Sequence, residues 1–142
     1  MNPAVLNESE LVSLKEALDD EYRSYETYAQ VVRDFGSVRP FINIVDAEAR
    51  HISALLTLFE AYNIAAPANR WPGQVSRFST LEEACAKSAQ GEIDNVAIYD
   101  RALLTTQRPD ILAVYHALRA ASQDRHLPAF RRCGGQRSRG GR

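Results

Sequence analysis

Apolar residues recur at helical spacing in four separate stretches of this chain, and no stretch shows the strict alternation of a half-buried strand. The first stretch opens at Asn7 with Glu10, a helix-start signal, and runs to Gly36. Its inner positions are Leu11, Leu14, Leu18, Tyr22, Tyr25, Tyr28 and Val32. The second stretch follows the short turn Ser37 to Pro40 and places on one face Phe41, Ile44, Glu48, His51, Leu55, Leu58 and Tyr62. Such a short connection predicts two antiparallel helices.

The periodicity fails between Asn63 and Ser79, where Pro67, Pro72 and Gly73 interrupt the chain. A connection of this length predicts a crossover that spans the whole bundle, so the second and third helices should run parallel. Thr80 with Glu83 starts the third helix, whose inner face reads Leu81, Cys85, Ser88, Glu92, Tyr99 and Leu103. Pro109 starts the fourth, whose inner face reads Leu112, Tyr115, Arg119, Gln123, His126 and Phe130.

These four helices, joined by a short, a long and a short connection, predict an all-α fold, a four-helix bundle with one long crossover between helices 2 and 3. The bundle is expected to occupy residues 1–133 as one domain. Residues 134–142 are rich in Gly and Arg and are expected to form a disordered tail.

The composition indicates the class of protein and its location in the cell, but it does not indicate a function. The chain has 142 residues, 45% hydrophobic and 25% charged, with a formal net charge of -1, as in ordinary soluble globular proteins. No apolar run is long enough to span a membrane. Cys85 and Cys133 suggest neither a disulfide framework nor a zinc pattern, and Cys85 is interpreted as a small buried hydrophobe. Because the two cysteines suggest no disulfide framework and no apolar signal peptide precedes Asn7, a reducing cytoplasm is the predicted location.

Glu48 and His51 are polar residues on an otherwise apolar helix face. Burying an ionised carboxylate costs several kcal/mol unless it is paired, hydrogen-bonded or bound to a metal. At about 1.5 Å of rise per residue, Glu21 and His51 both lie roughly 20 Å from the first helical hairpin. Glu92 and His126 lie at about the same height from the second hairpin. All four helices are therefore expected to bring polar side chains to the middle of the bundle.

Carboxylates and imidazoles gathered in this way are typical of a dinuclear metal site. Helix bundles with two metal ions take one Glu from each of two helices and a Glu-x-x-His pair from each of the other two. The predicted ligands here are Glu21, Glu48, His51, Glu92 and His126. Residues expected to surround the ligands, or to coordinate weakly, are Tyr25, Asn95, Arg119 and Gln123. Gln123 is interpreted as occupying the place of the fourth-helix Glu, which would make the second metal position the weaker one.

The sequence resembles the ferritin-like superfamily, and within it a short bacterial rubrerythrin-like branch of largely unassigned function. The resemblance spans about Leu11 to Cys133 and is carried by residues 47–51, 71–73, 92–101 and 121–130. In rubrerythrin-like relatives, residues equivalent to the five predicted ligands bind two irons that react with peroxide or dioxygen. The same branch commonly lacks the fourth-helix Glu, and this chain has no cysteine knuckle that could serve as an internal electron donor.

The resemblance implies a metal-binding protein with one or two ions per chain, iron or another divalent transition metal, and oxidoreductase activity of peroxidase or ferroxidase type. It names neither the catalytic residues nor the external electron donor. The first alternative is a degenerate, metal-free bundle, held by Arg119 and hydrogen bonds, that acts as a dimeric structural or interaction module. The second is a DNA-associated stress protein, which would rest on the arginine-rich tail alone, so nucleic-acid contact is not expected. A homodimer is predicted because bundles of this kind pair along their helix faces.

Without metal, the three buried carboxylates should repel one another. At least one of Glu21, Glu48 and Glu92 is therefore expected to have a raised pKa and to retain a proton near neutral pH.

Overall fold

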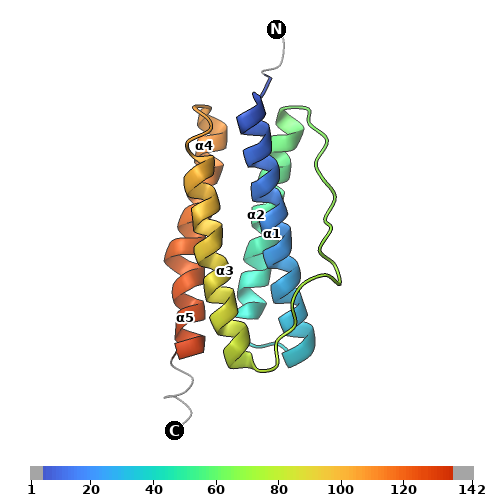
Figure 1. The fold of residues 1–142 in the computed structure, drawn as a ribbon, viewed down its shortest axis with the longest axis vertical. Helices are drawn as coiled ribbons and strands as arrows, with labels where there is room; N and C mark the ends of the chain where they lie inside the picture. The colour runs from blue at the N-terminus through green and yellow to red at the C-terminus, as the bar shows by residue number, and fades with distance from the viewer. Residues whose placement is uncertain (1–4, 136–142) are drawn as a thin grey trace.

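A computed structural model describes residues 5–135 of the protein, which form four helical rods (Figure 1). The helices are α1 (Glu8–Phe35), α2 (Phe41–Ala61), α3 (Leu81–Ala102), α4 (Pro109–Ala121) and α5 (Leu127–Gly135). A π-helical turn, η1 (Ser122–His126), joins α4 to α5, so the fourth rod consists of α4, η1 and α5 in succession. No strand occurs in the described residues, so the prediction of an all-α bundle is confirmed.

The helix ends follow the sequence signals. Asn7 accepts a hydrogen bond from the backbone N–H of Glu10, and the Glu10 carboxylate accepts one from the Asn7 N–H, which closes a capping box. Gly36 ends α1 with φ +91°, a conformation that L side chains rarely adopt. Thr80 caps α3, and Pro109 lies in the first turn of α4.

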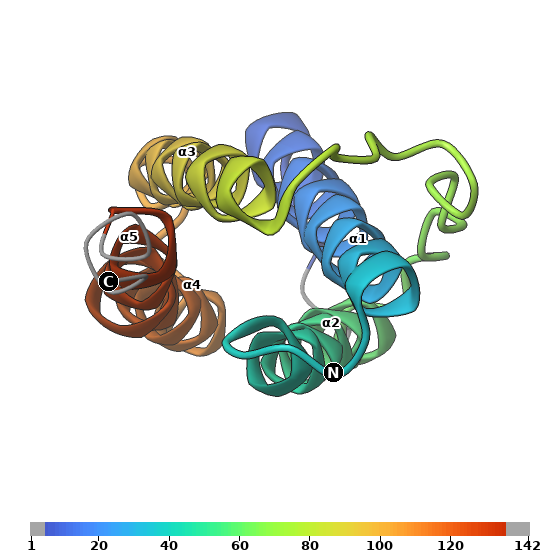
Figure 2. The same ribbon diagram turned by 90° about the horizontal axis from the view of Figure 1, so that it is seen from below.

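Viewed along its length, the bundle is a ring in which α1 lies between α2 and α3, and the α4–α5 rod closes the other side (Figure 2). Figure 1 shows α2 and α3 running in the same direction, with the connection between them returning along the outside of the bundle. Salt bridges and hydrogen bonds to α1 anchor this connection along its path. The anchoring pairs are Arg70–Asp19, Trp71–Asp19, Asn69–Glu26 and Arg77–Asp34.

Two apolar clusters fill the interior, one towards each end. One contains Leu14, Leu18, Leu55, Tyr99, Tyr115 and Leu118, and the other contains Tyr28, Val31, Phe41, Ile44 and Phe130. On every rod, the stretch between these two clusters carries the predicted polar core residues. The bundle therefore encloses a polar layer between two apolar layers.

Cys85 and Cys133 form a disulfide that ties α3 to α5. This corrects the sequence interpretation, which paired neither cysteine and took Cys85 for a small hydrophobe. Two cysteines 48 residues apart carry no pairing signal, and only the antiparallel packing of α3 and α5 brings their Cα atoms to 5.9 Å. The disulfide also removes the argument from the cysteines for a reducing compartment.

In the part of the chain that the structure describes, no helix is both long and apolar enough to cross a membrane. The predicted disordered tail is residues 134–142. The described residues end at Gly135, the last residue of α5, so almost all of the tail lies outside them.

Candidate metal centre

The five predicted ligands come together in the middle of the bundle. Their side chains form two groups, whose ligand atoms within each group all lie within 4.8 Å of one another. One group is Glu21, Glu48 and His51, and the other is Glu48, Glu92 and His126. Glu48 belongs to both groups, so its two oxygens can serve two neighbouring positions. All five residues are buried, with exposed fractions between 0% for Glu21 and 7% for His51.

The two histidines face the carboxylates from opposite helices. His51 Nδ1 lies 3.0 Å from Glu48 Oε1 and 3.3 Å from Glu21 Oε1. His126 Nδ1 lies 3.4 Å from Glu92 Oε1 and 3.7 Å from Glu48 Oε2. The imidazole rings stack with centroids 5.4 Å apart and an interplanar angle of 14°. Each half of the site thus contains one imidazole and one carboxylate of its own, plus the shared Glu48.

Two tyrosines hold the outer carboxylates by reciprocal hydrogen bonds between α1 and α3. Tyr99 donates to Glu21 Oε2 and Tyr28 donates to Glu92 Oε2, each at 2.5 Å. Both helices carry a Glu followed seven residues later by a Tyr, and because the helices pack antiparallel, each Tyr reaches the Glu of the other. These bonds fix the orientation of Glu21 and Glu92 and leave their Oε1 atoms directed at the histidines.

The pKa values of Glu48 and Glu21 shift in opposite directions. Burial, reinforced by the negative charges of Glu21 and Glu92, raises the pKa of Glu48 well above its ordinary value. Burial also acts to raise the pKa of Glu21, but hydrogen bonds from His51 and Glu48 outweigh it and hold the pKa low. The prediction that at least one buried carboxyl has a raised pKa is confirmed for Glu48.

Several buried polar atoms at this site have no hydrogen-bond partner. Across residues 5–135, four buried side-chain nitrogen or oxygen atoms lack one, namely Glu48 Oε1, Glu92 Oε1, His126 Nδ1 and Ser88 Oγ. Three of the four belong to the predicted ligands and point into the site. An unpaired polar atom in a protein interior costs free energy unless something binds it. Carboxylates and imidazoles in this arrangement could hold a metal ion.

A second set of polar residues supports Glu21. Asn95 donates to Asp20 Oδ2 at 2.8 Å and to Glu21 Oε2 at 3.3 Å, and its own oxygen accepts from Ser122 at 2.7 Å. Asn95 was predicted as a weak ligand or a partner of Glu92. Asn95 does lie beside a predicted ligand, but that ligand is Glu21, and the amide links α1, α3 and the π turn.

Three predicted neighbours of the site lie elsewhere. Gln123 is exposed, and Arg119 is on the surface with Nε 2.6 Å from Asp100 Oδ1. Neither side chain enters the core, because the π turn shifts the buried face of the fourth rod by one position, from residues 119 and 123 to Leu118 and Ser122. The interpretation of Gln123 as the fourth-helix Glu is therefore wrong. Tyr25 is only half-buried and makes no hydrogen bond to the site in the described chain.

Sequence reasoning missed the roles of Tyr28, Tyr99, Asp20 and Ser122. Both tyrosines are predicted to lie on inner helix faces and no partner is assigned to them, although the repeated Glu-x₆-Tyr spacing on the first and third helices is a usable signal. Nothing in the sequence marked Ser122, since its position depends on the π turn.

Two hollows flank the site. A cavity of about 260 Å³ between α1, α3 and the long connection is lined partly by Tyr28. On the other side, an open groove of about 590 Å³ is lined by His126 and by Arg39, Arg125 and Arg132. The first is called the side cavity below, and the second the arginine groove.

The sequence matches no protein-family model and no curated protein. The fold is similar to the crystal structure of a conserved hypothetical protein, rv2844, from Mycobacterium tuberculosis. The match has a TM-score of 0.79 and covers 89% of this chain and 91% of that chain, at 14% sequence identity. At this identity, the likeness shows a shared fold alone.

Proposed function

We propose that this chain is a ferritin-like protein that binds two divalent transition-metal ions, iron being the first candidate, at Glu21, Glu48, His51, Glu92 and His126. In this proposal the long connection between α2 and α3 is the ferritin-like crossover. The activity would be the oxidation of bound iron by peroxide or dioxygen, with electrons returned by an external donor.

The observation that carries the proposal is the pair of overlapping groups that share Glu48. A buried carboxylate between two imidazoles and two further carboxylates suits a bridge between two cations. The unpaired atoms of Glu48, Glu92 and His126 support the same function, since a metal would give each of them a partner.

The chain's own residues would prepare the site. Tyr99 and Tyr28 hold Glu21 and Glu92 in place, so little reorganisation is needed on binding. Glu48, whose pKa is raised, would release its proton when its oxygens become ligands. If iron is bound at these five residues, two ferrous ions would supply the two electrons that, with two protons, reduce one hydrogen peroxide to two water molecules. The apolar layers above and below the site would limit access of bulk water from the two ends of the bundle.

Anaerobic titration with Fe(II) tests the proposal. We expect binding to saturate near two ions per chain, and addition of hydrogen peroxide to oxidise both. Binding without oxidation would support the proposed metal site and contradict the proposed oxidoreductase activity. An absence of binding would favour the metal-free alternative, a structural bundle.

The metal-free alternative depends in part on Arg119 lying in the core, which the structure does not show. Arg119, expected to neutralise the core carboxylates, pairs with Asp100 on the surface instead. A metal-free core would have to rely on the proton of Glu48 and on hydrogen bonds from Tyr28, Tyr99 and Asn95.

The homodimer stays a prediction, and sedimentation over a range of concentrations tests it. The DNA-associated function rested on arginines of the tail, which lie outside the described residues. A cytoplasmic location likewise stays a prediction.

A further inference from the structure

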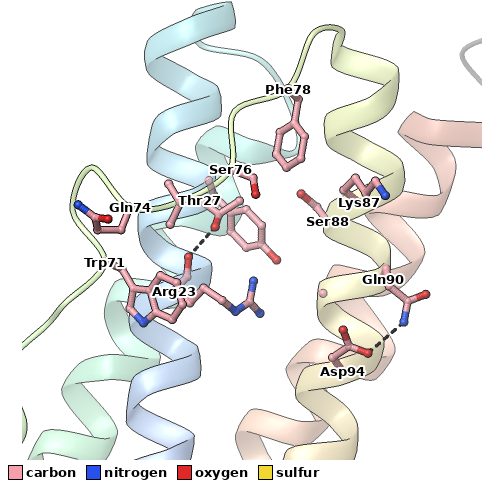
Figure 3. Close-up of a pocket in the computed structure, with 13 residues that line it drawn as sticks. Arg23, Thr27, Trp71, Gln74, Ser76, Phe78, Lys87, Ser88, Gln90 and Asp94 are labelled. Carbon is pink, nitrogen blue, oxygen red and sulfur yellow. Dashed lines mark hydrogen bonds between the residues drawn. The ribbon is translucent and has the colours of Figure 1, made fainter.

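The side cavity contains polar groups that the metal centre does not use. It lies between Arg23 and Thr27 of α1, Lys87 and Ser88 of α3, and residues 71–78 of the connection (Figure 3). Salt bridges from the connection to Asp19 and Asp34 of α1 hold the outer wall in place. The cavity is therefore built from three anchored segments.

Ser88 is the strongest sign of a ligand. Its side chain is 3% exposed, and its hydroxyl is the one unpaired buried atom of residues 5–135 that does not belong to the metal centre. In Figure 3 the hydroxyl points into the cavity, towards the α1 side. A molecule in the cavity would give this hydroxyl a hydrogen-bond partner.

Arg23 supplies a positive charge to the side cavity. Its Nε donates to Asp20 at 2.8 Å, and its two terminal nitrogens make no hydrogen bond within the described chain. The guanidinium extends from α1 towards α3, where it lies close to Gly91. A Cβ at Gly91 would come within 3.7 Å of both terminal nitrogens, which places them against this part of the cavity wall.

The charges and hydroxyls favour a ligand that accepts hydrogen bonds. Arg23 and Lys87 are cationic, and the acidic groups nearby already accept bonds: Asp20 from Arg23, and Asp94 from Gln90. Apolar surface lines the rest of the cavity, from Tyr28, Trp71, Val75 and Phe78. A volume of about 260 Å³ limits the ligand to a small molecule.

We propose that the side cavity binds a small carboxylate with an apolar body, its carboxylate against Arg23 and Ser88 and its body against Phe78 and Val75. The ligand would contact Tyr28, whose hydroxyl is bonded to Glu92, so it would lie one side chain away from the metal centre. Binding in this cavity does not require metal, and its test is independent of the proposed function.

The probe is 3-methylbutanoate, and the neutral alcohol 3-methylbutan-1-ol is its matched control. Trp71 is the one tryptophan of the sequence and lines the cavity, so its fluorescence reports binding directly. We expect the carboxylate to change this fluorescence saturably and the alcohol to bind at least about tenfold more weakly, since a hydrogen bond to a charged group contributes more than a neutral one.

Two variants locate the site. Ser88→Ala removes a hydroxyl that no other group uses, so the fold should be retained, and Arg23→Gln removes the charge. Each should weaken binding by about tenfold. Arg50→Gln, an exposed residue of α2 outside both hollows, is the control and should bind normally.

Three results would overturn the proposal. These are the absence of saturable binding to the wild-type chain, equal binding of the alcohol, and loss of binding in Arg132→Gln instead of Ser88→Ala. The last would place the carboxylate in the arginine groove.

Discussion

Ser122 donates a 2.7 Å hydrogen bond to Asn95, whose amide in turn donates to Glu21, and both Ser122 and Asn95 are buried. This bond lies at the place where a regular fourth helix would have directed Gln123 into the core. The π turn directs Gln123 to solvent instead, so a substitution at Gln123 should not affect the candidate metal centre.

Gln123→Glu should leave metal content unchanged, because the new carboxylate would lie in solvent away from the ligands. Metal analysis by mass spectrometry after loading with Fe(II) checks this, with Glu92→Gln as the variant that should lower it. A rise in bound iron in Gln123→Glu would mean that the fourth rod is a regular helix with Gln123 inside.

The sequence predicted most of the fold because its signals are local. The capping box of Asn7 and Glu10, Gly36 and Pro109 each mark a helix end through contacts within a few residues. The five candidate ligands could be picked out because a polar residue on an apolar face is visible in any helical pattern. Arg119 and Gln123 were misplaced because counting at 3.6 residues per turn backwards from His126 and Phe130 cannot register one wider turn. The disulfide and the Asn95 network depend on tertiary packing.

Glu48→Gln should change how the stability of the metal-free chain depends on pH. The pKa of Glu48 is raised in the folded state, so the folded chain binds more protons than the unfolded chain between the two pKa values. The free energy of unfolding of the wild type should therefore fall, through this group, as pH rises above about 4.3, by up to about 1.4 kcal/mol per pH unit. Glu48→Gln lacks this contribution.

Urea unfolding of both metal-free proteins measures the difference between their free energies of unfolding. The measurements run from pH 5 to pH 8, above the pKa of an unfolded Glu at about 4.3. The variant should become the more stable of the two as pH rises. Parallel curves would show that Glu48 has an ordinary pKa.

Tyr99→Phe and Tyr28→Phe form a matched pair of variants. Each removes the donor to one buried carboxylate, and we expect each to lower the free energy of unfolding by about 1–3 kcal/mol. Calorimetry or urea unfolding gives the value. Tyr22→Phe, at a half-buried tyrosine with no hydrogen bond in the described chain, is the control and should change stability little.

Gly91→Ala should stabilise the chain by about 0.5–1 kcal/mol, because Gly91 lies within α3, where glycine is unfavourable. The new Cβ would make ordinary contacts of 3.7 Å with Arg23. Thermal unfolding checks the sign. Destabilisation would mean that the new Cβ clashes with Arg23.

Reduction of the Cys85–Cys133 disulfide should lower the free energy of unfolding by about 2–4 kcal/mol, since it removes a cross-link between residues 48 apart. Unfolding with and without a reductant measures this. Cys85→Ala should behave like the reduced wild type and show no response to the reductant.

The metal content of the wild type beside Glu48→Gln tests the central claim most directly. Both proteins are loaded with Fe(II) without oxygen, freed of unbound iron and analysed by mass spectrometry, with circular dichroism to show that the variant is folded. Because Glu48 belongs to both ligand groups, the account predicts about two irons per chain in the wild type and almost none in the variant. Equal iron in the two proteins, or none in the wild type, would contradict it.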